Sequence, residues 1–350
     1  MRSSEHPIRR AIIMSLCFVL CVVLATVAIT VPWMRVYQDN DQRDALAGTI
    51  DTLYVGASYG VYGIVPSVFD AKTGASSYNI CGLSLPVYGI PPLLKKELAR
   101  NPVKRVYIVT SFQTLTRNQD EDGTEGDVYL LPRLGTLGER LDYARRHIPF
   151  ENVLSALSQD IFLAIRYFRY KLFGGMDMRQ VYADRGYSPF LHADMRLSEE
   201  SAARTRNASR INTARRSDNL AQLREVLRIC RDAGVEVAFV STPLTNREIW
   251  QHDGWDDYYA DFCTLAKDEG VPFYDFNLLK ARYTLFDDAL SYGDQYHLCD
   301  VGAHTFSEVF ADVMKKADSG ENVSDLFYAD YMEMKADSPY TRSSLSAIQK

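Results

Sequence analysis

The sequence predicts a three-layer α/β protein, in which helices cover both faces of a five-stranded parallel sheet. Five short apolar segments rich in β-branched and aromatic residues predict buried strands, at residues 52–55, 77–82, 104–111, 235–242 and 271–276. Amphipathic helical segments separate most of them, and this alternation is typical of βαβ units and a parallel sheet. We assign residues 51–318 to this domain, with a helical insertion at about 114–217.

The composition excludes some classes of function. The chain has 350 residues and a formal net charge of −6, so it gives no electrostatic reason to expect a nucleic-acid partner. Its six cysteines are scattered, and no pair has the spacing of a zinc site. The glycine-rich segment at 56–60 lacks both the dinucleotide-binding spacing and the lysine of a P-loop. We therefore expect no metal and no cofactor.

A membrane anchor is predicted at the N-terminus. Residues 11–31 carry no charge over roughly 20 positions, which is enough for a helix to cross the hydrocarbon core. Trp33 follows, where interfacial aromatic residues gather. Residues 1–10 contain three arginines, whereas only Arg35 follows the span closely, so this end is expected in the cytoplasm. Everything after the linker at 32–50 would then lie outside the cytoplasm, tethered by a single-pass helix.

A cleaved signal peptide is the alternative for the same segment. The sequence Thr-Val-Ala at 26–28 provides a small-residue cleavage site. The apolar segment is long for a signal peptide, however, and we favour the uncleaved anchor.

The first two predicted strands each run into a glycine. Residues 52–55 lead into GASYG, whose small residues allow a tight turn, so Ser58 is expected at the carboxyl end of the sheet. A helix is expected after this turn, and a loop leads on through Pro66. The second strand ends at Gly82, and a helix at 91–100, with proline in its first turn, leads to the third strand.

The alternation stops after the third strand. Residues 114–127 are acidic, residues 137–173 carry many aromatic residues and arginines at helical spacing, and residues 174–217 are irregular. We expect this insertion to cap the end of the sheet, with a helix at 162–173 near the mouth of the site. Its basic and aromatic helices either pack on the domain or face the membrane or substrate.

The alternation resumes at residue 218. A helix with an apolar stripe at 219–233 ends at a glycine and precedes the fourth strand. A helix at 255–269 precedes the fifth strand, and a final helix covers 302–316 after a loop at 294–298. In the tail at 319–350, residues 324–334 are expected to form one more element, and residues 335–350 to be disordered.

The ends of this domain hold residue types suited to nucleophilic catalysis. A serine needs a base to accept its proton, and Asp294 and His297 stand three positions apart on one loop, so the carboxylate can orient the imidazole. His304 is a rival base, but it falls inside the final helix. Asp275, at the end of the fifth strand, either packs at or caps that strand end, or positions a residue of the site without contacting the substrate. Three other histidines lack a carboxylate context: His147, His192 and His252.

Three short blocks resemble the SGNH, or GDSL-type, hydrolase superfamily: GASYG, ICGLS and DQYHL. This resemblance implies a flavodoxin-like sheet, with Ser58 as nucleophile and Asp294 and His297 as acid and base. It also implies an oxyanion hole built from the amides of Ser58 and Gly82. The superfamily's third block, Gly-x-Asn-Asp, is replaced here by TSFQ at 110–113, so Gln113 or Ser111 would have to substitute for its asparagine.

Two further segments resemble a membrane-anchored subgroup of that superfamily, which includes the D-alanyl-lipoteichoic acid transfer protein and cell-surface O-acyltransferases. They are GVEVAFVSTP, with the helix before it, and HLCDVGAHTFS, which is similar to the subgroup's HLN-x-x-GA-x-x-FS with Cys299 in place of asparagine.

The resemblance implies an extracytoplasmic serine acyl-esterase or O-acyltransferase. Its substrate would be an acylated cell-envelope glycan or a lipid-linked polymer, and a membrane-bound acyltransferase would be a partner. The alternative is a non-catalytic protein of the same fold that binds a membrane acyltransferase or an acyl carrier. Labelling by a serine-reactive probe distinguishes the two.

Overall fold

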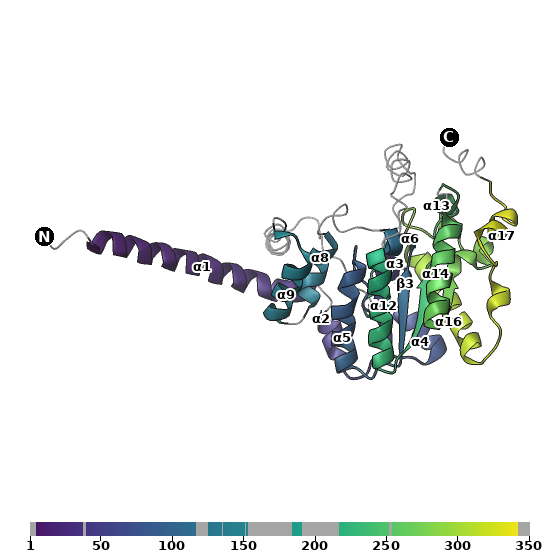
Figure 1. Cartoon of the computed structure of the whole chain (residues 1–350), viewed down its shortest axis with the longest axis horizontal. Helices are drawn as coiled ribbons and strands as arrows, with labels where there is room; N and C mark the ends of the chain where they lie inside the picture. Colours follow the sequence, from purple (N-terminus) through teal and green to yellow (C-terminus); the bar gives the residue numbers. More distant parts are fainter. Residues whose placement is uncertain are drawn as a thin grey trace.

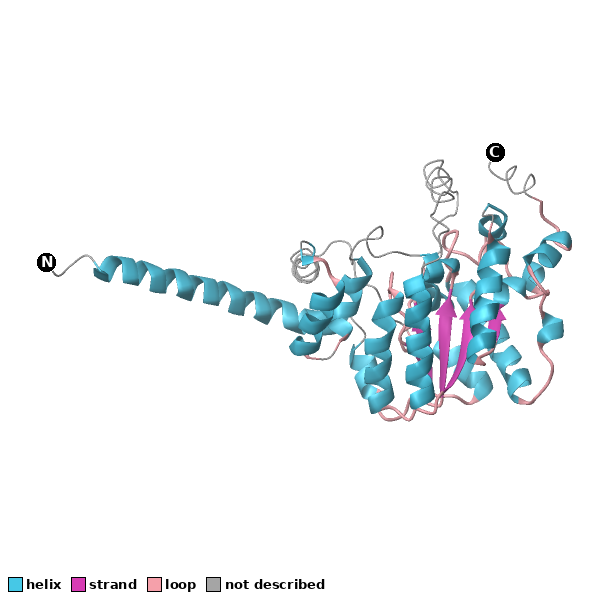
Figure 2. Ribbon diagram, in the orientation of Figure 1, coloured by secondary structure: helices cyan, strands magenta, loops and turns pink. Residues whose placement is uncertain are grey.

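The computed structural model describes residues 5–37, 40–116, 125–134, 136–150, 152, 184–190, 217–251 and 254–341. Its centre is a five-stranded sheet in the order β2-β1-β3-β4-β5, with every neighbouring pair parallel (Figure 2). The strands are β1 Thr52–Gly56, β2 Ser77–Asn79, β3 Arg105–Thr110, β4 Glu236–Ser241 and β5 Phe273–Asp275. The predicted five-stranded parallel sheet is confirmed, and its carboxyl edge gathers the ends of all five strands.

Helices cover both faces of the sheet (Figure 1). On one face α5 (Ile90–Arg100), α12 (Ser217–Asp232) and α14 (Trp255–Glu269) lie side by side. On the other, α4 (Pro66–Thr73) packs against α16 (Asp300–Asp318). The shorter elements are α2 Asn40–Ala45, α3 Ser58–Gly63, η1 Val87–Gly89, α6 Phe112–Thr116, α8 Glu125–Leu130, η2 Leu131–Arg133, α9 Leu137–His147, α13 Asn246–Gln251, η3 Phe276–Leu278, α15 Arg282–Leu285, η4 Ser324–Leu326 and α17 Tyr331–Ala336.

Apolar and aromatic side chains of the strands explain why the layers hold together. All five residues of β1 are buried, as parallel strands covered on both faces require. Tyr54 stacks on Tyr107 of β3 with ring centroids 5.7 Å apart, and Phe310 of α16 lies 4.9 Å from Tyr107. Burying such rings stabilises the sheet through the area removed from water.

A long helix, α1 (Glu5–Tyr37), extends away from the domain (Figure 1). Its segment Ile8–Thr26 is long and apolar enough to cross a membrane, and none of it is buried against the rest of the chain. This segment overlaps the predicted span at 11–31, while its orientation stays a prediction. The predicted linker at 32–50 contains the end of α1 and the short α2.

The helix expected after the glycine turn is α3, which lies within the segment from Ser58 to Pro66. The C-terminal tail is more regular than the sequence predicts, because α17 continues past residue 335. Tyr331 and Met334 of α17 are buried, and the Tyr331 hydroxyl donates to Asp275 Oδ2 at 2.8 Å. This packing holds the predicted element at 324–334 on the domain, directly before the segment that we expected to be disordered. Residues 342–350, the predicted helix at 162–173, His192 and His252 lie outside the described residues.

Candidate active site

Ser58 is the first residue of α3, directly after the turn that follows β1. The turn depends on close packing behind it. A Cβ at Gly60 would lie 2.3 Å from Cys81 Sγ, so any larger residue there would push α3 away from the loop after β2. This close approach fixes the Ser58 hydroxyl at the carboxyl edge of the sheet, where sites of open α/β folds lie.

Asp294 and His297 lie on a self-closed loop between Tyr292 and Leu298, which pair as an isolated antiparallel bridge. Asp294 Oδ1 accepts hydrogen bonds from the amides of Tyr296 and His297, each at 2.7 Å. These bonds fix the carboxylate against its own loop, as short-range Asx turns do. The three-residue spacing therefore leaves Oδ2 free to face the imidazole.

The structure brings the three predicted residues together. Ser58 Oγ lies 2.8 Å from His297 Nε2, and His297 Nδ1 lies 2.8 Å from Asp294 Oδ2. Burial raises the pKa of Asp294, but the His297 imidazole and the two loop amides outweigh it, so the pKa lies below its ordinary value. An ionised carboxylate accepts a hydrogen bond from Nδ1–H, and this tautomer leaves the Nε2 lone pair facing the serine. The arrangement can thus deprotonate Ser58, although a catalytic role stays a prediction.

Aromatic rings surround His297, and the sequence analysis did not predict them. The ring centroids of Tyr59 and Tyr62 lie 5.4 Å and 5.1 Å from that of the imidazole. Phe190 stacks on it at 5.7 Å with an interplanar angle of 25°. The two tyrosines follow Ser58 in the sequence SYGVY, and this spacing is a signal that the sequence offered. Phe190 lies in the irregular insertion, where no pattern marks it.

The predicted oxyanion role of Gly82 is not supported by the structure. The Gly82 amide donates to the Gly56 carbonyl at 2.9 Å, which extends the β1–β2 ladder by one step. An amide committed to a carbonyl is not available to an oxyanion, so Gly82 serves as part of the scaffold. The amide of Ser58, at the start of α3, donates no hydrogen bond within the part of the chain that the structure describes. Of the two predicted donors, it is the one that fits.

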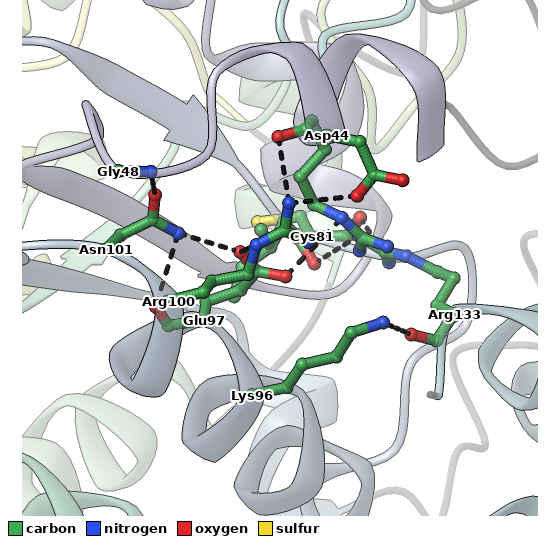
Figure 3. Close-up of polar contacts among 10 residues, drawn as sticks. Asp44, Gly48, Cys81, Lys96, Glu97, Arg100, Asn101 and Arg133 are labelled. Carbon is green, nitrogen blue, oxygen red and sulfur yellow. Dashed lines mark hydrogen bonds and ion pairs between the residues drawn. The ribbon is translucent and has the colours of Figure 1, made fainter. Parts of the chain in front are cut away.

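Arg133 holds the loop after β2, which contains Gly82, and the sequence analysis did not single it out (Figure 3). Its guanidinium is almost fully buried and donates to the carbonyls of Ile80 and Cys81, both at 2.9 Å. Lys96 donates to the carbonyl of Arg133 at 2.9 Å. Two peptide planes directly before Gly82 are thereby fixed in orientation.

The segment TSFQ at 110–113, which replaces the superfamily's third block, follows a strand adjacent to the one that precedes Ser58. β3 neighbours β1, and α6 starts directly after β3, so Ser111 and Gln113 stand at the same sheet edge as Ser58. The Ser111 amide donates to Thr114 Oγ1 at 2.9 Å, so only the side chains of Ser111 and Gln113 could offer a donor here. Among the residues described, no hydrogen bond joins Gln113 to the triad, so its role as a donor stays a prediction.

The rival residues have structural roles. His304 lies on α16 with its side chain 47% exposed, and its Nδ1 is 2.9 Å from the Asp300 carbonyl. Asp275 is buried and accepts from Asn277 and from Tyr331. His147 packs against Tyr88 and lines a cavity of about 730 Å³ between α5, α9 and α12. Within the described ranges, no group of His, Cys, Asp and Glu has a geometry that could hold a metal ion.

No known protein family matches the sequence, and no curated protein matches it. Among solved structures, one from Bacteroides fragilis, provisionally described as an acylhydrolase, is 9% identical, with a TM-score of 0.38, and covers 81% of this chain and 98% of its own. One from Streptococcus pneumonia, provisionally described as a platelet activating factor, is 12% identical, with a TM-score of 0.34, and covers 85% of this chain and 98% of its own. An acetyl xylan esterase from Butyrivibrio proteoclasticus is 9% identical, with a TM-score of 0.32, and covers 78% of this chain and 65% of its own. Resemblances this distant do not identify the reaction.

Proposed function

We propose that the protein is a serine acyl-esterase or O-acyltransferase that works through an acyl-serine intermediate. The observation that carries the proposal is the continuous relay from Asp294 through His297 to Ser58, with both contacts at 2.8 Å. A hydroxyl, an imidazole and a carboxylate in this order are the groups that activate a serine nucleophile. Their position at the carboxyl edge of a parallel sheet is where such folds bind ligands.

In the proposed mechanism, His297 Nε2 takes the Ser58 proton while Oγ attacks an ester carbonyl. The imidazolium formed is stabilised by Asp294 and then protonates the leaving alkoxide, so the ester C–O bond breaks and an acyl-serine remains. The Ser58 amide faces the developing oxyanion, and Gln113 would supply a second donor. A second hydroxyl compound, water or an alcohol, gives its proton to His297 and takes the acyl group.

The proposed setting is the outer face of a membrane. The apolar segment Ile8–Thr26 with arginines before it supports a single-pass anchor whose N-terminus is cytoplasmic. A tethered acyl-serine enzyme would act on an acylated envelope glycan or a lipid-linked polymer, with a membrane-bound acyltransferase as partner. Recovery in the membrane fraction after a high-salt wash, with protease access to the domain from outside, is expected. A soluble mature chain starting near residue 29 would contradict the anchor.

Labelling with a serine-reactive fluorophosphonate tests the reaction class. The detergent-solubilised full chain should be labelled at Ser58, as located by peptide mapping, and Ser58→Ala should not be labelled. His304→Ala is the matched control, because this histidine lies on α16 and should leave labelling unchanged. Labelling at another serine would exclude the triad.

A non-catalytic partner of a membrane acyltransferase or an acyl carrier is the second candidate. One observation favours it: the Gly82 amide is engaged, and the third block lacks its asparagine, so two expected oxyanion donors are missing. The loss of one such donor costs about 10²–10³ in rate. A chain that binds an acyl carrier yet never reacts with fluorophosphonate would establish this alternative.

A further inference from the structure

We propose that Phe190 selects the acyl acceptor, so that the acyl group passes from Ser58 to the hydroxyl group of an alcohol in preference to water. This inference rests on the proposed acyl-serine intermediate. It concerns a residue of the insertion that neither accepts a proton nor contacts Ser58 through a hydrogen bond.

Phe190 forms one wall of the space beside the candidate base. Its ring stacks on the His297 imidazole at 5.7 Å and 25°, and it meets Tyr62 edge to face at 4.7 Å. Tyr62 in turn meets the imidazole edge to face at 5.1 Å. Two rings from two separate segments, Phe190 of the insertion and Tyr62 of α3, thus make an apolar corner around the imidazole that must deprotonate the acceptor.

The loop that carries His297 is shaped to receive this ring. A Cβ at Gly293 would lie 1.9 Å from Phe190 Cδ1 and 2.5 Å from its Cε1. Any side chain at position 293 would therefore displace the ring from the imidazole. The glycine gives an independent way to move Phe190 without changing the phenylalanine itself.

The segment at 184–190, which ends at Phe190, is held on the domain by polar contacts of its own. The amide of Asn79 donates to the Arg185 carbonyl at 2.9 Å, and the Ser188 amide donates to the Val61 carbonyl at 3.0 Å. Tyr187 donates to Asp300 at 2.7 Å, and Arg185 pairs with Asp70. These bonds reach β2, α3, α4 and α16.

The chemistry of deacylation gives this wall a consequence. The acceptor oxygen attacks the acyl carbonyl, His297 Nε2 takes its proton, the bond from the carbonyl carbon to Ser58 Oγ breaks, and Oγ recovers the proton. Water yields a carboxylic acid and an alcohol yields a new ester. An alcohol gains by burying its C–H groups against the rings, whereas water gains nothing from them. A single methylene in an apolar pocket is worth about 10–200-fold in selectivity.

The partition of one acyl donor between two acceptors tests the proposal. The full chain is given p-nitrophenyl acetate with glycerol in water, and acetylglycerol and acetate are both quantified. Phe190→Ala should lower the ratio of acetylglycerol to acetate by about tenfold or more. Gly293→Ala should lower it in the same direction. Phe150→Ala is the matched control and should leave the ratio unchanged, because that side chain is 91% exposed.

A second readout does not depend on turnover. Carbethoxylation of His297 by diethyl pyrocarbonate should be faster in Phe190→Ala than in the wild type, because the ring no longer covers the imidazole. An unchanged product ratio in Phe190→Ala overturns acceptor selection, even if carbethoxylation accelerates. A wild type that never forms acetyl-serine overturns the proposed function itself, and carbethoxylation then still reports whether Phe190 covers the base.

Discussion

His297 and His147 both pack against tyrosine rings, but their polar neighbours differ. His297 has a carboxylate oxygen 2.8 Å from Nδ1 and a serine hydroxyl 2.8 Å from Nε2. His147 stacks on Tyr88 with centroids 4.8 Å apart, and the hydroxyls of Tyr88 and Tyr143 both donate to Asp127. Burial, together with the charge of Arg146, lowers the pKa of His147. Aromatic packing is thus common to both regions, and what distinguishes His297 is the carboxylate beside Nδ1 and the serine hydroxyl beside Nε2.

The largest effect should separate the two histidines directly. His297→Ala should reduce fluorophosphonate labelling and ester turnover by on the order of 10⁶-fold, as loss of Ser58 would, because members of such a unit fail together. His147→Ala should leave both within about twofold, since it touches no reacting group. Rates are measured on the full chain with p-nitrophenyl acetate. Equal losses in the two variants would refute the comparison.

Removing the charge of the orienting carboxylate should have the next largest effect. Asp294→Asn keeps the size of the side chain but can present an N–H to Nδ1, which turns the imidazole to the wrong tautomer, and turnover should fall by about 10⁴-fold. Asp142→Asn is the control, because that carboxylate pairs with Arg146 beside His147. Full activity in Asp294→Asn would mean that the carboxylate does not orient the base.

Removing Arg133, whose guanidinium holds the loop after β2, should have a smaller effect on the rate. Arg133→Met leaves the buried carbonyls of Ile80 and Cys81 without their donor, at a cost of about 1–3 kcal/mol each in the free energy of unfolding. The same loop packs through Cys81 against Gly60 of α3, the helix that begins at Ser58. We therefore expect the kcat to fall by about 10–100-fold with little change in KM, which is less than the loss of a complete oxyanion donor would cost.

Two controls keep that result interpretable. Arg133→Lys should recover part of the activity, and Arg145→Met, at a side chain 83% exposed, should change neither rate nor thermal unfolding. A fall in thermal stability with an unchanged kcat would show that Arg133 supports only the fold.

The smallest effect concerns the pH dependence of stability. The pKa of His147 lies below its ordinary value, so the unfolded chain binds this proton first as the pH falls below about 6.5. The group therefore contributes stability above pH 6.5 that is lost on acidification. His147→Phe keeps an aromatic ring and should lose less stability than the wild type between pH 8 and pH 5 in urea unfolding, with labelling of Ser58 unchanged. A larger loss in the variant would contradict the assignment.

The sequence predicted the sheet and the position of the triad because both follow from local rules. Strand periodicity locates Ser58 after the first strand, and a three-residue spacing lets one loop orient Asp294 and His297. Phe190 and Arg133 could not be predicted in this way, since each acts on a segment far along the chain and belongs to an insertion without a clear period. The partner of the Gly82 amide could not be predicted either, because a glycine at a strand end predicts close approach but not which carbonyl its amide will meet.

The distance between Ser58 and His297 along the chain has a consequence for biosynthesis. Ser58 follows the first strand and His297 follows the fifth, 239 positions later. At translation rates of about 5–20 residues per second, the serine is made roughly 10–50 seconds before its base. A nascent or prematurely terminated chain therefore carries a hydroxyl with no means of activation. Under the proposed function, chemical competence would arrive only once the last strand has joined the sheet, so incomplete products would be inert toward esters around them.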